Sequence, residues 1–221
     1  MSDIDKLAWV LKERFDHVGA RKSMGWLTTS LNVLNCVLSL NRNYDKFVHP
    51  RVKAFEKCHP SIEELAQLRD LIDSYESPVR FSIQELDYNY CEWAQMLRGV
   101  VEYLINVQQE YEGSNEYERL QRWATSVTPK DADSVGVKGF GLSGFQYLRM
   151  LFGAQTTKPD RHIIRFVSEA VGRRVSDRVA VDLLEQAAQR VGLPVCGIDK
   201  AIWEERARGQ SRCRADHSLS E

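Results

Sequence analysis

Apolar side chains recur every three or four residues along almost the whole chain, which is the period of an amphipathic α-helix. The first two such runs lie in residues 4–15 and 27–38, and a later run, residues 84–111, is interrupted near Asn89. No stretch alternates apolar and polar residues over the length of a strand. The pattern therefore predicts an all-α fold, with about ten helices joined by short loops.

Three helix starts carry capping signals. Ser61, with Glu64 three residues later, fits a capping box. Thr128 precedes a proline, which is favoured at the first helical position. Ser176 precedes an amphipathic run that stops at Gly192. We therefore expect helices to begin after each of these residues.

The composition is that of a globular protein. Of 221 residues, 43% are hydrophobic and 28% charged, enough for one substantial core or two small ones. No uncharged apolar run approaches the roughly 20 residues of a membrane span, and residues 3–14 alternate charged and apolar side chains, so we expect a cytoplasmic protein with no membrane partner. The five widely spaced cysteines predict reduced thiols and no metal site. The polar residues 209–221 predict a disordered tail.

The charge is unevenly distributed. A net charge of -1 argues mildly against a nucleic-acid partner. Residues 137–178, however, hold eight basic residues against three acidic ones, a local balance of +5. Residues 42–53 hold four basic residues and one acidic residue. Such runs are usually solvated faces, so charge alone leaves the partner open.

Residues 137–153, VKGFGLSGFQYLRMLFG, predict a tight turn from Gly139 to Gly141 and then a strongly apolar helix. Glycines permit positive φ and the close approach of another backbone. The following helix presents unpaired N–H groups and the positive end of its dipole. Together these features suit a phosphate, although a tight turn between two helices without a ligand is equally consistent.

Asp160 opens another predicted helix shortly after this segment. It is the only acidic residue between Asp133 and Glu169, and it lies in the basic region. A carboxylate there could stabilise a developing positive charge. An aspartate between Pro159 and an amphipathic run is also a good helix cap. The two roles do not exclude each other.

With this continuation, residues 137–165 resemble the helix-hairpin-helix DNA glycosylases, the superfamily of endonuclease III, the adenine-mismatch glycosylases and the alkyladenine glycosylases. The matching positions are Gly139, Gly141, Gly144, Gly153, Asp160 and His162. A weaker similarity covers residues 34–45, where Asn41 stands at a position that is usually glutamine in the family. The resemblance implies two helical lobes with a cleft between them: residues 27–155, ending in the hairpin, and residues 1–26 plus 158–208.

The resemblance also implies an activity. Such an enzyme flips a base out of double-stranded DNA and hydrolyses its N-glycosidic bond, with Asp160 assisting the attack of water. Bifunctional members carry a lysine where this chain has Ser143, and the four C-terminal cysteines of the iron–sulfur branches are absent. The implied protein is a monomeric, monofunctional glycosylase without an iron–sulfur cluster, although the hairpin could hold a monovalent cation.

Further residues follow from the same resemblance. The residues expected to contact DNA are Lys138, Gly139, Gly141, Ser143, Gly144, Asn41, Arg42, Arg161 and His162. The aromatic residues that could stack on a flipped base are Trp26, Tyr44, Tyr88 and Trp93. An aromatic stripe at helical spacing is, however, more often core than binding platform. Likewise, residues 41–43 could be an ordinary polar loop, and His162 an ordinary half-buried histidine.

Two other functions remain open at this point. The chain could be a helix-hairpin-helix protein that binds DNA without catalysis, with Asp160 only a cap. It could also be a helical interaction protein that binds no DNA, which the near-neutral total charge allows. Within the enzyme hypothesis, the sequence does not identify the base, nor whether the role is genome repair or defence against modified phage DNA.

Overall fold

The computed structural model describes residues 1–19, 25, 26 and 28–217, with the backbone alone for residues 207–217. The described chain is helical and contains no strand, which confirms the all-α prediction. The α-helices are α1 (Asp3–Phe15), α2 (Thr29–Leu38), α3 (His49–Cys58), α4 (Leu65–Asp73), α5 (Pro78–Leu86), α6 (Cys91–Val107), α7 (Glu116–Ser126), α8 (Leu142–Leu151), α9 (Arg161–Val171), α10 (Asp177–Val191) and α11 (Val195–His217). A π-helical turn, η1 (Tyr44–Val48), and two 3₁₀ segments, η2 (Gln108–Glu110) and η3 (Pro129–Val135), complete the set.

The chain divides into two compact units. Unit 1 consists of residues 1–22 and 155–221, and unit 2 of residues 23–154. Unit 1 is thus built from two segments that flank unit 2 in the sequence. The predicted lobes had boundaries a few residues away, and Leu27, where one of them begins, lies outside the described residues.

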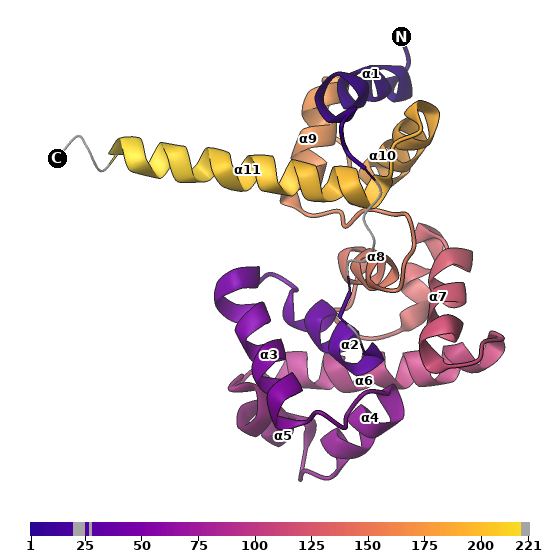
Figure 1. Cartoon of the computed structure of the whole chain (residues 1–221), viewed down its shortest axis with the longest axis vertical. Helices are drawn as coiled ribbons and strands as arrows, with labels where there is room; N and C mark the ends of the chain where they lie inside the picture. The colour runs from indigo at the N-terminus through magenta and orange to yellow at the C-terminus, as the bar shows by residue number, and fades with distance from the viewer. Residues whose placement is uncertain (20–24, 27, 218–221) are drawn as a thin grey trace. The chain divides into compact units, whose positions relative to one another are not determined.

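Unit 1 has its own core, formed where α1, α9, α10 and α11 pack together (Figure 1). Leu7, Leu11 and Phe15 lie on one face of α1, as the helical period predicts, and are buried. They pack with apolar residues of α9 and α10 that include Phe166 and Leu184. This core holds the start of α9, and therefore Asp160, in place.

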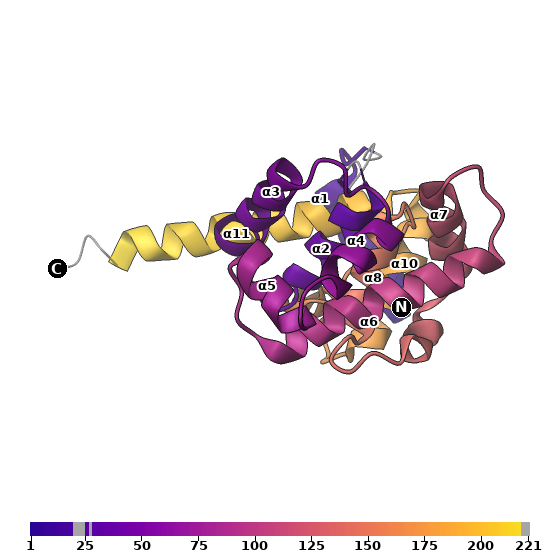
Figure 2. The ribbon, with the colours of Figure 1, turned by 90° about the horizontal axis from the view of Figure 1, so that it is seen from below.

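Unit 2 is organised around α2 and α6. Every residue of α2 is buried, and α6 packs against α2, α4 and α5 (Figure 2). The helix α8 packs against α2, α7 and the 3₁₀ segment η3. Trp123 of α7 and Phe145 of α8 meet edge to face, with ring centroids 5.8 Å apart. These contacts fix the turn that joins η3 to α8.

A buried carboxylate crosslinks three parts of unit 2. Glu116, at the first position of α7, accepts hydrogen bonds from the hydroxyl of Thr29, from the Leu65 backbone N–H at 2.9 Å and from Gln108 Nε2 at 2.9 Å. Both carboxylate oxygens are used. Because a buried charge is tolerated only when it is hydrogen-bonded, this site ties α2 and the start of α4 to α7.

The capping predictions meet different outcomes. Ser176 is the N-cap of α10, which ends at Gly192 with a φ of 71°, as predicted. Thr128 caps η3 as predicted, but with a 3₁₀ segment following it rather than an α-helix. The Ser61 prediction is wrong: α4 begins three residues later, with Glu64 as its N-cap and Gln67 completing the capping box.

The last helix is longer than the sequence pattern suggests. The backbone of α11 is helical from Val195 to His217, across most of the stretch for which the composition predicts a disordered tail. Residues 218–221 lie outside the described part of the chain. None of the helices described is both long and apolar enough to cross a membrane.

Candidate functional site

The turn that precedes α8 requires one of its two glycines. Gly139 has a φ of 84°, and a Cβ there would lie 2.7 Å from Met96 Cε. The turn is closed by the Phe140 N–H, which donates to the Val137 carbonyl at 3.0 Å. Gly141 has a φ of −94° and open space where a Cβ would be. The turn's conformation therefore explains Gly139 but not Gly141.

Gly141 instead serves as the N-cap of α8. Because it has no side chain, no side-chain oxygen caps the first N–H groups of the helix. Those groups belong to the positions that begin at Leu142, followed by the half-buried Ser143, and Lys138 is exposed in the turn before them. Uncapped N–H groups at the positive end of a ten-residue helix can bind an anion such as a phosphate.

Gly144 has a packing role that the sequence does not reveal. It is buried, its carbonyl accepts a hydrogen bond from the Cys36 thiol at 3.4 Å, and a Cβ there would lie 2.7 Å from the Phe140 ring. Phe140 is itself buried, so the ring closes the turn against the first turn of α8. Gly144 therefore shapes the turn before α8 from within.

We expect Gly144→Ala to destabilise the protein by about 1 to 3 kcal/mol, because the added methyl displaces the Phe140 ring. Gly141→Ala is the matched control, since its Cβ enters open space, and should cost less than about 1 kcal/mol. Urea unfolding followed by circular dichroism measures both. Equal losses in the two variants would contradict the packing role of Gly144.

Asp160 lies in unit 1, as the N-cap of α9. Its Oδ1 accepts the backbone N–H groups of His162 at 2.7 Å and Ile163 at 3.0 Å. Its Oδ2 has no hydrogen-bond partner among the described residues. The side chain is half-buried. The carboxylate thus caps the helix with one oxygen and keeps the other available for chemistry.

His162 follows on the first turn of α9 and is half-buried. Burial lowers the pKa of His162, and the nearby arginines 161, 165 and 206 lower it further, whereas the charge of Asp160 opposes them. Arg161 Nε donates to His162 Nε2 at 3.3 Å, so this ring nitrogen is an acceptor. At neutral pH, His162 is therefore an uncharged hydrogen-bonding group and not a cation for a phosphate.

A second carboxylate lies behind Asp160, and no sequence motif marks it. Asp199 of α11 accepts hydrogen bonds from Thr157 Oγ1 at 2.6 Å and from the Lys158 N–H at 3.1 Å. Burial raises the pKa of Asp199 to about 6, and the negative charge of Asp160 contributes to the rise. The only signal that could have found this residue is its contact with the turn before Asp160, which needs the three-dimensional fold.

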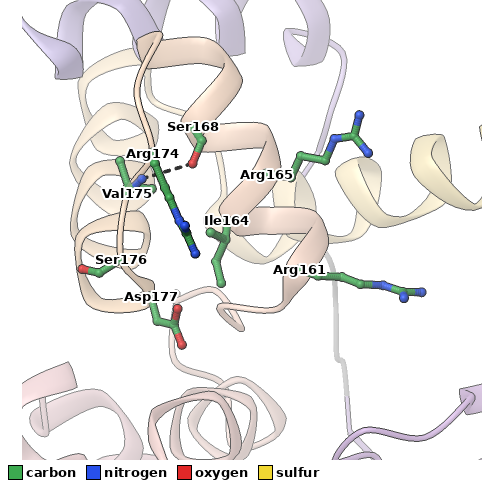
Figure 3. Close-up of a pocket in the computed structure, with 8 residues that line it drawn as sticks. All are labelled: Arg161, Ile164, Arg165, Ser168, Arg174, Val175, Ser176 and Asp177. Carbon is green, nitrogen blue, oxygen red and sulfur yellow. Dashed lines mark hydrogen bonds between the residues drawn. The ribbon is translucent and has the colours of Figure 1, made fainter.

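A pocket of about 710 Å³ lies beside α9 in unit 1 (Figure 3). It is lined by Arg161, Ile164, Arg165, Ser168, Arg174, Val175, Ser176 and Asp177. Arg174 extends along the gap between α9 and the start of α10, whereas Arg161 and Arg165 point away from it (Figure 3). Arg165 pairs with Glu169 at 2.7 Å, while Arg174 has no ion-pair partner among the described residues. The basic run of the sequence thus supplies three arginines to the lining of this pocket.

In unit 2, Arg42 lies on aromatic rings. Its guanidinium is 5.6 Å from the ring centroid of Tyr88 and 5.7 Å from that of Phe47, and it donates to the Tyr88 hydroxyl at 2.7 Å. Asn41, before it, is exposed and has a φ of 57°. The loop that resembles a DNA-inserting loop therefore presents an exposed amide beside an arginine held by aromatic residues.

The four aromatic residues expected at a base pocket fall into separate places. Trp26 and Tyr44 both contact the His49 ring, at centroid distances of 5.7 Å and 6.2 Å. Tyr88 contacts Trp93 at 5.0 Å. Trp93, however, is only 3% exposed, and its indole N–H donates to a backbone carbonyl of α2. It is a core residue with no ring face open to a base, which removes it from the pocket.

Comparison with known proteins gives a family and no activity. A family profile described as "Domain of unknown function (DUF8548)" matches residues 93–207. No curated protein and no solved structure matches the chain. The matched range contains the hairpin, Asp160 and Asp199, but it begins after Asn41 and Arg42. The family description assigns no chemistry to these residues.

Proposed function

The chain belongs to the family described as "Domain of unknown function (DUF8548)", and we propose that it is a monofunctional DNA glycosylase. The observation that carries the proposal is the hydrogen bonding of the Asp160 carboxylate. Its Oδ1 caps α9, and its Oδ2 has no hydrogen-bond partner among the described residues. In this proposal, double-stranded DNA is bound, one nucleotide is flipped out, and its base is released by a monomer.

Hydrolysis of an N-glycosidic bond needs little more than such a carboxylate. As the bond between C1′ and the base nitrogen breaks, its electron pair goes to the base and the sugar develops positive charge. Asp160 Oδ2 would stabilise that charge and accept a proton from the attacking water, whose oxygen forms the new bond to C1′. The departing base takes up a proton from solvent, Asp160 returns to solvent the proton that it accepted from water, and an abasic site remains.

Two features of the hairpin support the DNA-binding part of the proposal. The uncapped start of α8 offers backbone N–H groups suited to one phosphate, and Lys138 adds a positive charge nearby. A separate feature, Ser143, concerns the reaction type. In the glycosylase family that this segment resembles, bifunctional enzymes have a lysine nucleophile at this position, so a serine supports hydrolysis by water without strand cleavage. Arg42 and Arg161 supply further positive charge.

A second function, DNA binding without catalysis, is favoured by one specific observation. Asp160 already makes two good cap hydrogen bonds, which by themselves account for an aspartate at this position. The two functions differ in a single measurable property, because only a glycosylase releases free base.

The test is a base-release screen with the whole chain. Duplexes that carry alkylated, deaminated, oxidised or mismatched bases, and phage genomes with hypermodified bases, are incubated with the protein. Mass spectrometry detects free base, and gel electrophoresis detects strand breaks before and after alkali. We expect one substrate class to release base and to break only after alkali.

Each other outcome decides against part of the proposal. Breaks before alkali treatment would contradict the monofunctional mechanism. Duplex binding that weakens with salt, without base release from any substrate, would favour the non-catalytic function. Absence of duplex binding at low salt would contradict both functions.

A further inference from the structure

The turn that carries Asp160 is anchored from behind by side chains of α10 and α11. Thr156 and Thr157 are fully buried. The Thr156 hydroxyl donates to Glu185 of α10, and the Cys196 thiol donates to the Thr156 carbonyl at 3.5 Å. Asp199 holds the two residues of this segment that lie closest to Asp160, Thr157 and Lys158. The segment is therefore held in place over several successive residues.

Asp199 accepts two hydrogen bonds from the turn that precedes Asp160. Its Oδ2 accepts from Thr157 Oγ1 at 2.6 Å and from the Lys158 N–H at 3.1 Å. The Lys158 carbonyl in turn accepts the Asp160 N–H at 2.7 Å, across the buried Pro159. Asp199 thus binds the N–H of Lys158, and the carbonyl of the same residue binds the N–H of Asp160. A shift of Lys158 would therefore move the backbone of Asp160.

We propose that Asp199 is a positioning residue for Asp160: its ionised carboxylate holds Thr157 and Lys158 so that Asp160 Oδ2 meets the sugar and the attacking water. This inference rests on the proposed glycosylase function. Hydrogen bonds to an ionised acceptor are stronger than those to a neutral one. The hydrogen bonds from Thr157 and Lys158 should therefore be stronger when Asp199 is charged and weaker when it is neutral.

The charge state of Asp199 changes within an accessible pH range. Burial raises its pKa from 3.8 to about 6, the charge of Asp160 acts in the same direction, and Thr157 and Lys158 oppose the rise. Since the folded state favours the protonated form, the stability from this group is fully present below pH 3.8 and is lost as the pH rises through about 6. Above that pH, ionised Asp199 costs stability while it holds the turn.

The test compares Asp199→Asn and Asp199→Ala with the wild-type chain in single-turnover base release as a function of pH. For the wild type, we expect the rate to rise with pH through an inflection near 6. Asparagine keeps an acceptor but has no charge, so its rate should be about tenfold lower at neutral pH and should show no inflection. Alanine removes the acceptor and should lower the rate by about 100-fold.

Two controls separate positioning from other effects. His162→Gln removes the other titratable side chain beside Asp160, whose pKa is lowered by burial, and the inflection should persist in this variant. Hydrogen exchange of the Lys158 amide should quicken most in Asp199→Ala and less in Asp199→Asn, which keeps a neutral acceptor. The urea midpoint of Asp199→Asn at neutral pH should equal or exceed that of the wild type, which excludes unfolding as the cause of lost activity.

The outcomes distinguish this inference from the function on which it rests. A wild-type chain that releases no base would overturn both, whatever the exchange rate of Lys158. A wild-type chain that releases base, with an Asp199→Asn variant of equal rate and unchanged pH profile, would overturn the positioning role alone. Loss of the inflection in His162→Gln would assign it to the histidine and would also overturn the role.

Discussion

Asp160→Asn is expected to lower base release by about 10³-fold or more, because the variant loses the charge that stabilises the sugar cation and the base that activates water. Asparagine is as good an N-cap as aspartate, and its side-chain oxygen can still accept the N–H groups of His162 and Ile163. The start of α9 should therefore keep its structure, and DNA affinity should change little.

The measurement is single-turnover base release on the substrate that the screen identifies, together with duplex binding and urea unfolding. Asp182→Asn is the matched control: this aspartate is exposed on α10 of the same unit, and its loss should leave the rate unchanged. Full activity of Asp160→Asn would refute the catalytic assignment. Loss of DNA binding together with activity would instead point to a role in binding.

Glu116→Ala is expected to destabilise the protein by about 3 kcal/mol, which would be the largest loss of stability from a single polar side chain among our predictions. The substitution leaves the Leu65 N–H, the Thr29 hydroxyl and the Gln108 amide without their buried acceptor. Glu116→Gln keeps one acceptor oxygen and should lose about 1 kcal/mol. Urea unfolding measures the three proteins.

The predicted order of stability is wild type, then glutamine, then alanine. An exposed glutamate, Glu112, provides the control, since its side chain is 97% exposed and its replacement by alanine should change the free energy of unfolding by less than about 0.5 kcal/mol. If Glu116→Ala were as stable as Glu112→Ala, the buried hydrogen bonds would have no net stabilising effect.

The sequence predicts helices well where a single physical signal dominates. The spacing of Leu7, Leu11 and Phe15 indicates the buried face of a helix, and all three are buried on α1. At residues 61–67 two overlapping patterns compete for the same helix start, and the pair of Glu64 and Gln67 is the one that forms. Serine is the better N-cap by residue type, so the later start depends on tertiary contacts such as the hydrogen bond from the Leu65 N–H to Glu116.

The candidate site is predictable only where it is continuous in sequence. Asp160 stands next to the backbone groups that it caps, so its place at a helix start follows from a few neighbouring residues. Asp199 reaches Thr157 from 42 residues away, and nothing in its own neighbourhood distinguishes it from a surface aspartate. For Trp93, the helical spacing is compatible with a place in the core and with a place in a base pocket. Only its burial in the structure shows that it is a core residue.

The order of the two units along the chain has a consequence for synthesis. Since residues 23–154 form unit 2, α1 leaves the ribosome well before its partners α9 and α10. At a typical translation rate, the apolar face of α1 stays without these partners for on the order of ten seconds. Unit 2, a single continuous segment of the chain, can fold during this time. In a nascent chain the turn before α8 is therefore complete before Asp160 can take its place in the core of unit 1.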